Sequence, residues 1–419
     1  MTRLGYLLLC VLLLMGCNSS EESLDPFDYY PISDRFDVPA SDLQPIVELL
    51  SKYQLIGLGE ASHQGGATFE TKSRLLKAMH DQGELGFIAM ESGLYDGLVA
   101  WQNYLTGKQA LQDGVVGPDA NFHFMLRHSN EVGYLFEYVN SVDQSSHPLI
   151  LVGYESRISS DPGCSVMYEE LETYLLDNGL KADELREVKE IAPIMACPWY
   201  TGVDYTLALH NRLLAALQAV EPRLVKQKAL EVVPPYDPEN PRDFRSYASY
   251  WLQQVRSMQA HAVTNFNNEA YHYADAQSAD NLRWLRDEWF GLGDTQMAVW
   301  GHNIHATKMH GSMFSAYLKL EPEISSYALW VLNSHGWNAP PIPESWRWES
   351  EKFTFQVDSS HLASRLYRAG IPNAIIDLTV LDGAHELHRP QNLGFMVASP
   401  SSVADGLLNI PVERAATAR

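Results

Sequence analysis

Short apolar runs that alternate with helical patterns are the feature that most constrains the fold of this chain. The run Leu55–Gly59 is followed by an amphipathic stretch over Thr68–His80 and then by the apolar run Phe87–Met90. Such alternation is typical of βαβ units in a parallel sheet. Further strands are expected at Leu149–Gly153, Gln296–Gly301, Ser326–Leu332 and Asn373–Leu378. The pattern predicts the α/β class, with a mainly parallel (mixed) sheet flanked by helices.

A long helical segment interrupts this alternation. Between Ile158 and about Trp289 the sequence shows no strand pattern, whereas its apolar spacing indicates several helices. We therefore expect one α/β domain over residues 41–400, with a helical insertion at about residues 158–289.

The N-terminal residues have the pattern of a bacterial lipoprotein signal. Arg3 precedes the apolar run Leu4–Met15, which is shorter than the roughly 20 residues that span a bilayer. The run leads into Gly16-Cys17, which resembles the lipoprotein cleavage box and makes Cys17 the expected lipidation site. We expect a signal peptide over residues 1–16, a tether over residues 17–40, and a chain anchored to the cell envelope by lipid alone, facing the periplasm or exterior. An ordinary secretory signal is the alternative.

The net charge argues against a nucleic-acid partner, and the cysteine content allows one disulfide. Lys plus Arg number 30 against 52 for Asp plus Glu, and the resulting net charge of -22 would repel a polyphosphate backbone. A nucleic-acid partner is therefore not expected. Apart from Cys10 and Cys17, the chain holds only Cys164 and Cys197, which in an oxidising compartment could form one disulfide.

Ionisable side chains follow four of the predicted strands. They are Glu60, Glu91, Glu155 and His302. In parallel α/β sheets, ligands bind outside the carboxyl ends of the strands. If these strands are neighbours, the four side chains converge on one site; a polar residue that merely ends an apolar strand is the alternative for each of them.

Two histidine-containing segments carry the candidate chemistry. His63 lies in the loop that follows the first strand, and an imidazole with a pKa near its usual value of about 6.5 can take a proton from water. Glu60 or Glu91 could supply a carboxylate that fixes its tautomer, although a helix cap or loop hydrogen bond would also account for this histidine. His302 and His305 leave another strand end together. These five side chains include enough ligands for zinc, so a metal site stays open.

A covalent nucleophile is disfavoured by the sequence. No Gly-x-Ser-x-Gly motif places a serine after a predicted strand. Water activated by a side chain is therefore the preferred nucleophile.

The blocks that contain these residues resemble the erythromycin esterase family. They are Gly57-Leu58-Gly59-Glu60-Ala61-Ser62-His63, Phe69-Glu70-Thr71-Lys72, Gly86-Phe87 through Met90-Glu91-Ser92-Gly93, and Trp300-Gly301-His302-Asn303-Ile304-His305. Weaker similarity covers most of the chain from about Ala40. The resemblance implies a mixed α/β body with a helical part, and metal-independent hydrolysis of a macrolide lactone in the members that name the family.

The resemblance also implies roles for individual residues. His63 would be the base that activates water, Glu60 and Glu91 would orient it and stabilise its charge, and His302 and His305 would complete the site and stabilise an oxyanion. Lys72 and Glu155 are expected to bind substrate. Lys72 stands where macrolide-active members are expected to carry arginine, and an ammonium cannot reproduce a bidentate guanidinium contact. This departure bears on macrolide specificity more than on hydrolysis.

Three functions follow for this chain. The first is a carboxylic ester hydrolase without a cofactor or covalent intermediate, acting on a small-molecule ester or lactone. The second is a metal-dependent hydrolase that uses the same histidines and glutamates. The third is an envelope lipoprotein that binds a small molecule or a metal without turnover. The sequence leaves the oligomeric state open.

Overall fold

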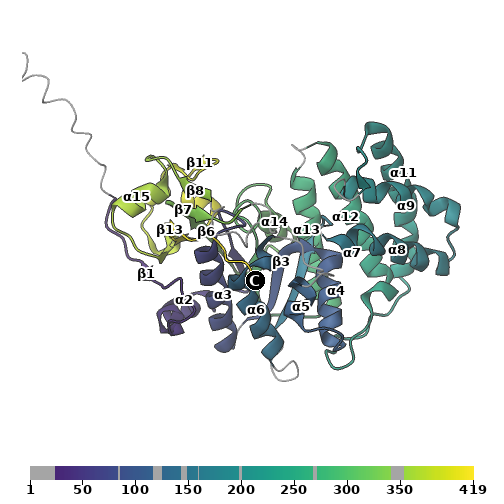
Figure 1. Ribbon diagram of the computed structural model, residues 1–419, viewed down its shortest axis with the longest axis horizontal. Coiled ribbons are helices and arrows are strands. Elements are labelled where there is room, and N and C mark those ends of the chain that lie inside the picture. Colours follow the sequence, from purple (N-terminus) through teal and green to yellow (C-terminus); the bar gives the residue numbers. More distant parts are fainter. Residues whose placement is uncertain are drawn as a thin grey trace, which may run out of the picture.

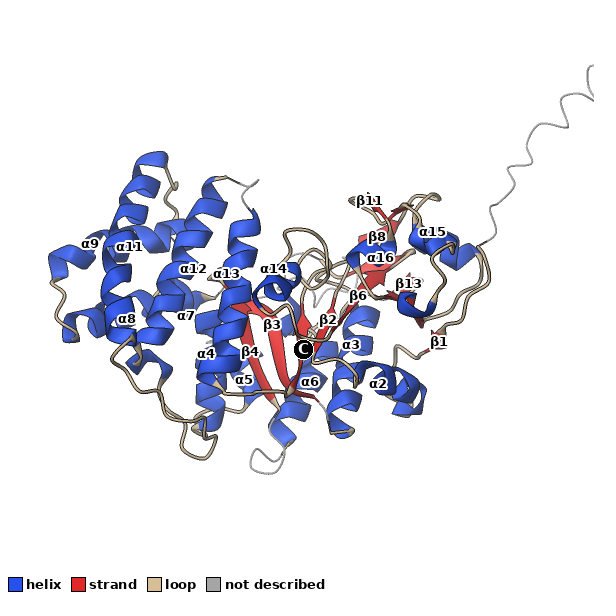
Figure 2. Cartoon of the chain, turned by 180° about the vertical axis from the view of Figure 1, so that it is seen from behind, coloured by secondary structure: helices blue, strands red, loops and turns tan. Residues whose placement is uncertain are grey.

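The structure is a computed structural model (Figure 1), and it describes residues 24–83, 85–116, 125–142, 149–158, 160–197, 201–267, 271–340 and 353–419 of the 419-residue chain. Figures 1 and 2 show a central sheet between a helical part at one end and the small C-terminal strands with helix α15 at the other. Among the described residues, no helix is both long and apolar enough to span a bilayer.

The central sheet is mixed and mainly parallel, as the sequence predicts. Its order is β1-β9-β12-β6-β2-β5-β3-β4, and only β1 and β12 pair antiparallel with β9. The strands are β1 (Tyr30–Pro31), β2 (Leu55–Leu58), β3 (Leu85–Gly93), β4 (Ile150–Glu155), β5 (Gln296–Trp300), β6 (Ser326–Leu332), β9 (Ala374–Asp377) and β12 (Gly406–Asn409). All six predicted strands are present. Almost every residue of β2 to β6 is buried, because both faces are covered by other elements.

Helices from the first half of the chain flank the sheet. They are α2 (Gln44–Leu50) after η1 (Ala40–Leu43), α3 (Gly66–Asp81), α4 (Leu94–Leu105), α5 (Leu111–Val116) and α6 (Asn130–Ser141), which follows η2 (Met125–His128); α14 (Met313–Leu320) is added later in the chain. Helix α3 packs on α6, and α4 packs on β4. The first amides of α3 have no partner within the helix, and the buried carboxylate of Glu413 accepts those of Ala67 and Thr68 at 2.7 and 3.3 Å. The C-terminal segment thereby satisfies free amides in the first turn of α3.

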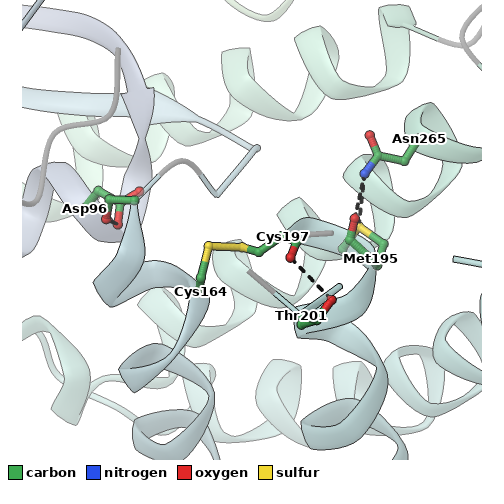
Figure 3. The surroundings of a disulfide bond; sticks show 7 residues. Asp96, Cys164, Met195, Cys197, Thr201 and Asn265 are labelled. Atoms are coloured by element: carbon green, nitrogen blue, oxygen red, sulfur yellow. Dashed lines mark hydrogen bonds between the residues drawn. A yellow bond between two sulfur atoms is a disulfide. The ribbon is translucent and has the colours of Figure 1, made fainter. Parts of the chain in front are cut away.

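The predicted helical segment forms the end of the molecule beyond β4 (Figure 2). It comprises α7 (Asp161–Cys164), α8 (Val166–Asp177), α9 (Ala182–Ala196), α11 (Leu207–Lys228), η3 (Phe244–Ser246), α12 (Ala248–Phe266) and α13 (Tyr271–Trp284), which continues into the π-helical turn η5 (Leu285–Trp289). Cys164 and Cys197 form a disulfide with a Cα–Cα distance of 5.8 Å (Figure 3). Asn265 of α12 donates to the Met195 carbonyl at 2.8 Å. Helix α9 is therefore linked to α7 by the disulfide and to α12 by this hydrogen bond.

The C-terminal part contains elements that the sequence does not predict. A three-stranded sheet has the order β13-β7-β8 and a hairpin pairs β10 with β11. The elements are β7 (His335–Asn338), β8 (Phe353–Gln356), α15 (Leu362–Arg368), η8 (Leu378–Val380), η9 (Glu386–His388), β10 (Gln391–Asn392), β11 (Val397–Ala398), α16 (Pro400–Val403) and β13 (Val412–Glu413). The expected end of the domain at residue 400 is wrong, because β12 lies inside the central sheet between β9 and β6.

The expected tether over residues 17–40 is also too long. Tyr30 and Pro31 pair with β9, Ile32 is buried, and Arg74 of α3 donates to the Ser33 carbonyl and to Asp42. Residues from Tyr30 onward therefore belong to the folded body. The signal peptide and the lipidation site Cys17 lie outside the described residues and stay predictions.

Candidate functional site

The four strands that end in ionisable residues are neighbours in the sheet. Strands β2, β5, β3 and β4 stand side by side and run parallel, so Glu60, His302, Glu91 and Glu155 come from one edge. This is the arrangement that the sequence argument requires.

Two glycines let the loop after β2 adopt its path. A Cβ on Gly59 would lie 2.2 Å from Oδ1 of Asn303 and 2.8 Å from the Leu329 carbonyl oxygen. A Cβ on Gly65 would lie 2.6 Å from the carboxylate of Glu413. Both positions therefore exclude a side chain, and the loop carrying His63 packs directly on its neighbours.

Glu60 has three side-chain partners at the base of the site. Its side chain is fully buried, with Oε1 at 2.7 Å from Nδ1 of His63 and Oε2 accepting from Nζ of Lys72 at 2.8 Å and from Nε1 of Trp300 at 2.7 Å. Burial alone would raise its carboxyl pKa, but Lys72 and His63 outweigh burial and lower that pKa to about 2. Glu60 is thus a fixed anion beneath the histidine.

His63 is the part of this pair that a ligand can reach. Its side chain is 24% exposed, while that of Glu60 is 0% exposed. Burial favours the neutral ring, but the hydrogen bond with Glu60 and the charges of Glu91, Glu60 and Glu155 outweigh burial and raise the His63 pKa to about 9. The charges of these three carboxylates thus hold the His63 pKa above the usual histidine value of about 6.5.

Lys72 is buried against Glu60, whereas the sequence predicts that it contacts the substrate. Its side chain is fully buried, and its ammonium lies 2.8 Å from Glu60 and 4.0 Å from the centroid of the Trp300 ring. Burial outweighs the attraction of Glu60 and lowers the Lys72 pKa to about 8. The expectation of a substrate contact is wrong for Lys72, because it lies beneath Glu60 and holds that carboxylate instead.

Glu91 connects the two histidine segments. It stands at a register shift in β3, where its Oε2 accepts the backbone N–H of His302 at 2.5 Å and its Oε1 lies 3.4 Å from Nε2 of His305. Burial raises the Glu91 pKa, although the neighbouring His305 and His63 act in the opposite direction.

The two histidines after β5 differ in their surroundings. The ring of His302 lies 5.5 Å from that of His63, and burial together with the charge of His63 lowers the His302 pKa to about 4. His305 is buried, with Nδ1 at 2.9 Å from Oδ1 of Asp275 and Nε2 at 2.6 Å from the Tyr271 hydroxyl. Burial lowers the His305 pKa, but Glu91 and Asp275 outweigh burial and raise it.

Glu155 stays near the site and pairs with a residue that the sequence analysis does not single out. Arg157 donates to its Oε1 at 2.5 Å and lies 3.9 Å from Oε1 of Glu91. Because Glu155 is only 5% exposed, the role proposed for it in substrate binding needs access through this ion pair.

Sequence reasoning misses the residues that the helical part contributes. Asp275 and Tyr271 stand on α13, about one helical turn apart, within a stretch that reads as an ordinary surface helix. Trp300 lies inside a recognised block, but its indole contact with Glu60 has no sequence signal. Contacts between α13 and the loop after β5 bring Tyr271 and Asp275 to His305, whereas Trp300 reaches Glu60 from β5 itself.

A cavity of about 320 Å³ opens beside His302. Apolar side chains from β6, β8 and the hairpin form much of its wall; the lining residues are Ala61, Ser62, His302, Asn303, Val331, Leu332, Asn333, Asn338, Phe355, Val357, His361, Leu393, Gly394 and Phe395. None of these described lining residues is Asp, Glu, Lys or Arg. The His361 pKa is lowered by burial, as is that of His302, so the wall is uncharged near neutral pH.

Three of the side chains have the spacing of a metal-binding set. One ligand atom each of Glu60, His63 and Glu91 lies within 4.8 Å of the others. Both oxygens of Glu60 already bind His63, Lys72 and Trp300, and the ammonium of Lys72 would repel a cation beside it. A metal bound by this set would compete with these contacts of Glu60.

Comparison with known proteins identifies a curated relative. No known protein-family profile matches the sequence. The chain is 21% identical over 319 residues to the Bacillus subtilis protein named "Putative hydrolase YbfO", a match that covers 70% of this chain. The chain spans 66% of that relative's length, just under two thirds.

Solved structures share the fold along nearly the whole chain. A succinoglycan biosynthesis protein has a TM-score of 0.67 at 16% identity, and a Bacillus cereus protein has 0.68 at 16%; each match covers 93% of this chain and 96% of the other. An erythromycin esterase variant in its open conformation has a TM-score of 0.64 at 14% identity, covering 90% of this chain and 95% of the other. The chain therefore has an erythromycin esterase-like fold.

Proposed function

We propose that this protein is a hydrolase that opens carboxylic esters with water activated by His63. The observation that carries the proposal is the 2.7 Å contact between Nδ1 of the partly exposed His63 and the buried carboxylate of Glu60. A carboxylate on one ring nitrogen fixes the tautomer and leaves the other nitrogen to accept a proton. The names of the relatives, a hydrolase and an erythromycin esterase, agree with this class of reaction.

The chemistry follows from the contacts of the two histidine segments. Neutral His63 takes a proton from water as the water oxygen bonds to the ester carbonyl carbon. The imidazolium that forms is stabilised by Glu60 and by the nearby charge of Glu91. We assign to His302, whose ring lies 5.5 Å from that of His63, the role of donating to the carbonyl oxygen and stabilising its developing charge.

The uncharged cavity beside His302 favours a neutral, apolar part of the substrate. Its volume of about 320 Å³ lies at the lower end of small-molecule sites. An anionic substituent would lose its hydration there without gaining a cationic partner among the described lining residues. We therefore place the apolar acyl or alcohol portion of a small ester in this cavity, and a macrolide lactone is one ester to be tested.

The first test is mass spectrometry of a macrolide and a panel of neutral esters and lactones incubated with purified protein. The His63→Gln variant should lose turnover, whereas His310→Gln, which changes an exposed histidine outside the site, should keep it. Addition of one water to the macrolide supports a macrolide esterase. Hydrolysis of other esters alone supports the mechanism and removes the macrolide as substrate.

Two other functions have distinct outcomes in the same assay. The spacing of Glu60, His63 and Glu91 favours a metal-dependent hydrolase as the second candidate. In that case chelation abolishes turnover and zinc or manganese restores it. Saturable binding without turnover of any ester would instead indicate a ligand-binding protein.

We also propose that the chain is lipid-anchored in a bacterial envelope. The Gly16-Cys17 box motivates the anchor, and the disulfide between Cys164 and Cys197 agrees with an oxidising compartment. Metabolic labelling with a fatty acid in the native host should mark the wild type and not Cys17→Ser. Equal labelling of both would refute lipidation at this residue.

A further inference from the structure

The helical part of the molecule contributes two residues that form hydrogen bonds with His305 in the site. Asp275 lies 2.9 Å from Nδ1 of His305, and the Tyr271 hydroxyl lies 2.6 Å from Nε2 of the same ring. Both residues stand on α13, while His305 follows β5. The base His63 and its partner Glu60 take no part in these hydrogen bonds. The activation of water by His63 therefore leaves Tyr271, His305 and Asp275 without a role.

Resting on the proposed ester hydrolysis, we propose that Tyr271 is the general acid that protonates the leaving alcohol, with His305 and Asp275 resupplying its proton. Ester cleavage needs such a group, because an alkoxide is a poor leaving group in the absence of a proton donor. A donor on a different element from the base can face the leaving oxygen while His63 holds the attacking water.

The surroundings of His305 favour its protonated form. Asp275 faces Nδ1, and Oε1 of Glu91 lies 3.4 Å from Nε2. Burial and the guanidinium of Arg157 oppose protonation, but Glu91 and Asp275 outweigh them and raise the His305 pKa. When both ring nitrogens carry hydrogens, Nε2 donates to the Tyr271 oxygen, and the phenol proton then points to another acceptor.

The Tyr271 hydroxyl can make a second hydrogen bond besides the one to His305. Its bond to His305 is its one hydrogen bond within the described part of the chain, and the residue is partly exposed. The Arg157 guanidinium carbon lies 5.4 Å from the centroid of its ring, so a positive charge is close by when negative charge develops on the phenol oxygen. Burial nevertheless raises the Tyr271 pKa, so the resting side chain is a phenol and not a phenolate.

In the proposed step the leaving oxygen takes its proton from Tyr271. As the carbon–oxygen bond of the tetrahedral intermediate breaks, its electron pair moves onto the leaving oxygen, which takes the Tyr271 proton. The Tyr271 oxygen takes the proton from Nε2 of His305, which becomes neutral. The products are the acid and the alcohol. Proton transfer through solvent from the protonated His63 to His305 restores the starting state.

The test compares two esters with the same neutral acyl group, one of an alkyl alcohol and one of an acidic nitrophenol. A nitrophenolate leaves without a proton, so only the alkyl ester needs the donor. For Tyr271→Phe we expect about a 100-fold loss of kcat on the alkyl ester and less than about a 3-fold loss on the nitrophenyl ester, the scale of general acid catalysis. Asp275→Asn should show the same selectivity with a smaller loss.

The matched control is Tyr273→Phe, which removes a hydroxyl from a residue of the same helix that is 54% exposed. It should leave both rates unchanged, and circular dichroism should show that all variants are folded. Equal losses on both esters, or no loss on the alkyl ester, would overturn the assignment while leaving ester hydrolysis in place. Absence of His63-dependent turnover of either ester by the wild type would overturn the proposed function and this inference together.

Discussion

The ammonium of Lys72 lies 2.8 Å from Oε2 of Glu60, and neither side chain is exposed to solvent. The other oxygen of the same carboxylate lies 2.7 Å from Nδ1 of His63. One buried anion therefore joins a fully enclosed cation to a histidine that a ligand can reach. The charge on Lys72 keeps Glu60 ionised, and the ionised Glu60 in turn determines the tautomer and the pKa of His63.

Removing the cation should cost the fold a large part of its stability. Lys72→Met leaves the buried Glu60 carboxylate with less compensation, and we expect a loss of about 3–5 kcal/mol in the free energy of unfolding. Urea denaturation followed by circular dichroism measures this change. The control is Lys77→Met, which breaks an exposed pair with Asp81 and should cost no more than about 1 kcal/mol.

A double variant distinguishes the effect of the unpaired buried charge on stability from the effect of lost packing. Glu60→Gln combined with Lys72→Met removes both charges, so it should be more stable than Lys72→Met alone. If the loss in the double variant is instead the sum of the two single losses, the two side chains are not coupled and Lys72 does not hold Glu60 through its charge.

Activity should rise with pH over an unusual range. Because the His63 pKa is raised to about 9, most of the ligand-free protein holds a protonated His63 at neutral pH. Only the neutral ring can accept a proton from water, so kcat/KM for the nitrophenyl ester, which needs no proton donor, should increase with pH and level off above a midpoint near pH 9. Initial rates measured well below saturation, across a buffer series of constant ionic strength, give this profile.

The carboxylate partner should determine the midpoint of that profile. Glu60→Gln removes the hydrogen bond and the charge that raise the His63 pKa, so the midpoint should move to lower pH while the maximal rate falls. A kcat/KM that decreases as pH rises through the same range would show that the protonated His63 is the active form, as a donor to the substrate and not as a base.

The central sheet could be predicted from the sequence because its strands are buried on both faces. Runs such as Phe87–Met90 and Ser326–Leu332 are apolar along most of their length, and such runs separated by helical patterns are typical of a parallel sheet covered by helices. Strands β7 and β8 escaped prediction because they are short and partly exposed, so their residues, such as Trp337 and Phe353, follow no clear alternation. Strand β1 is two residues long and depends on β9 for its conformation.

The candidate site was predictable only where chemistry and strand ends coincide. Glu60, Glu91 and His302 follow buried strands, so their convergence follows from a parallel sheet once the strand order is known. Asp275 and Tyr271 come from a helix that is distant in sequence, and nothing in their spacing indicates a histidine partner. The buried position of Lys72 also depends on tertiary packing, because amphipathic helices usually leave lysine in solvent.

The apolar cavity beside His302 should be sensitive to a single new charge. Phe395 lines the cavity and is 57% exposed, so Phe395→Glu should fold normally while placing a carboxylate against the neutral part of the substrate. We expect kcat/KM for a neutral ester to fall about tenfold, mainly through KM, which corresponds to about 1.4 kcal/mol. Val397→Glu is the matched control, because Val397 is 70% exposed on the same hairpin and does not line the cavity. Equal effects of the two variants would place the substrate elsewhere.

The disulfide should stabilise the helical part without serving the chemistry. Cys164 and Cys197 close a loop with a sequence separation of 33, joining the end of α7 to the residue after α9 (Figure 3). Loop closure of this length restricts the unfolded chain by about 3–4 kcal/mol, so reduction with dithiothreitol should lower the urea midpoint of the wild type. The double variant Cys164→Ala/Cys197→Ala should resemble the reduced wild type and show no response to reductant. The two cysteines lie outside the hydrogen-bonded groups around His63 and His305, so the activity per folded molecule should stay constant after reduction. A lower rate in the folded, reduced protein would instead mean that the disulfide positions the α13 residues that contact His305.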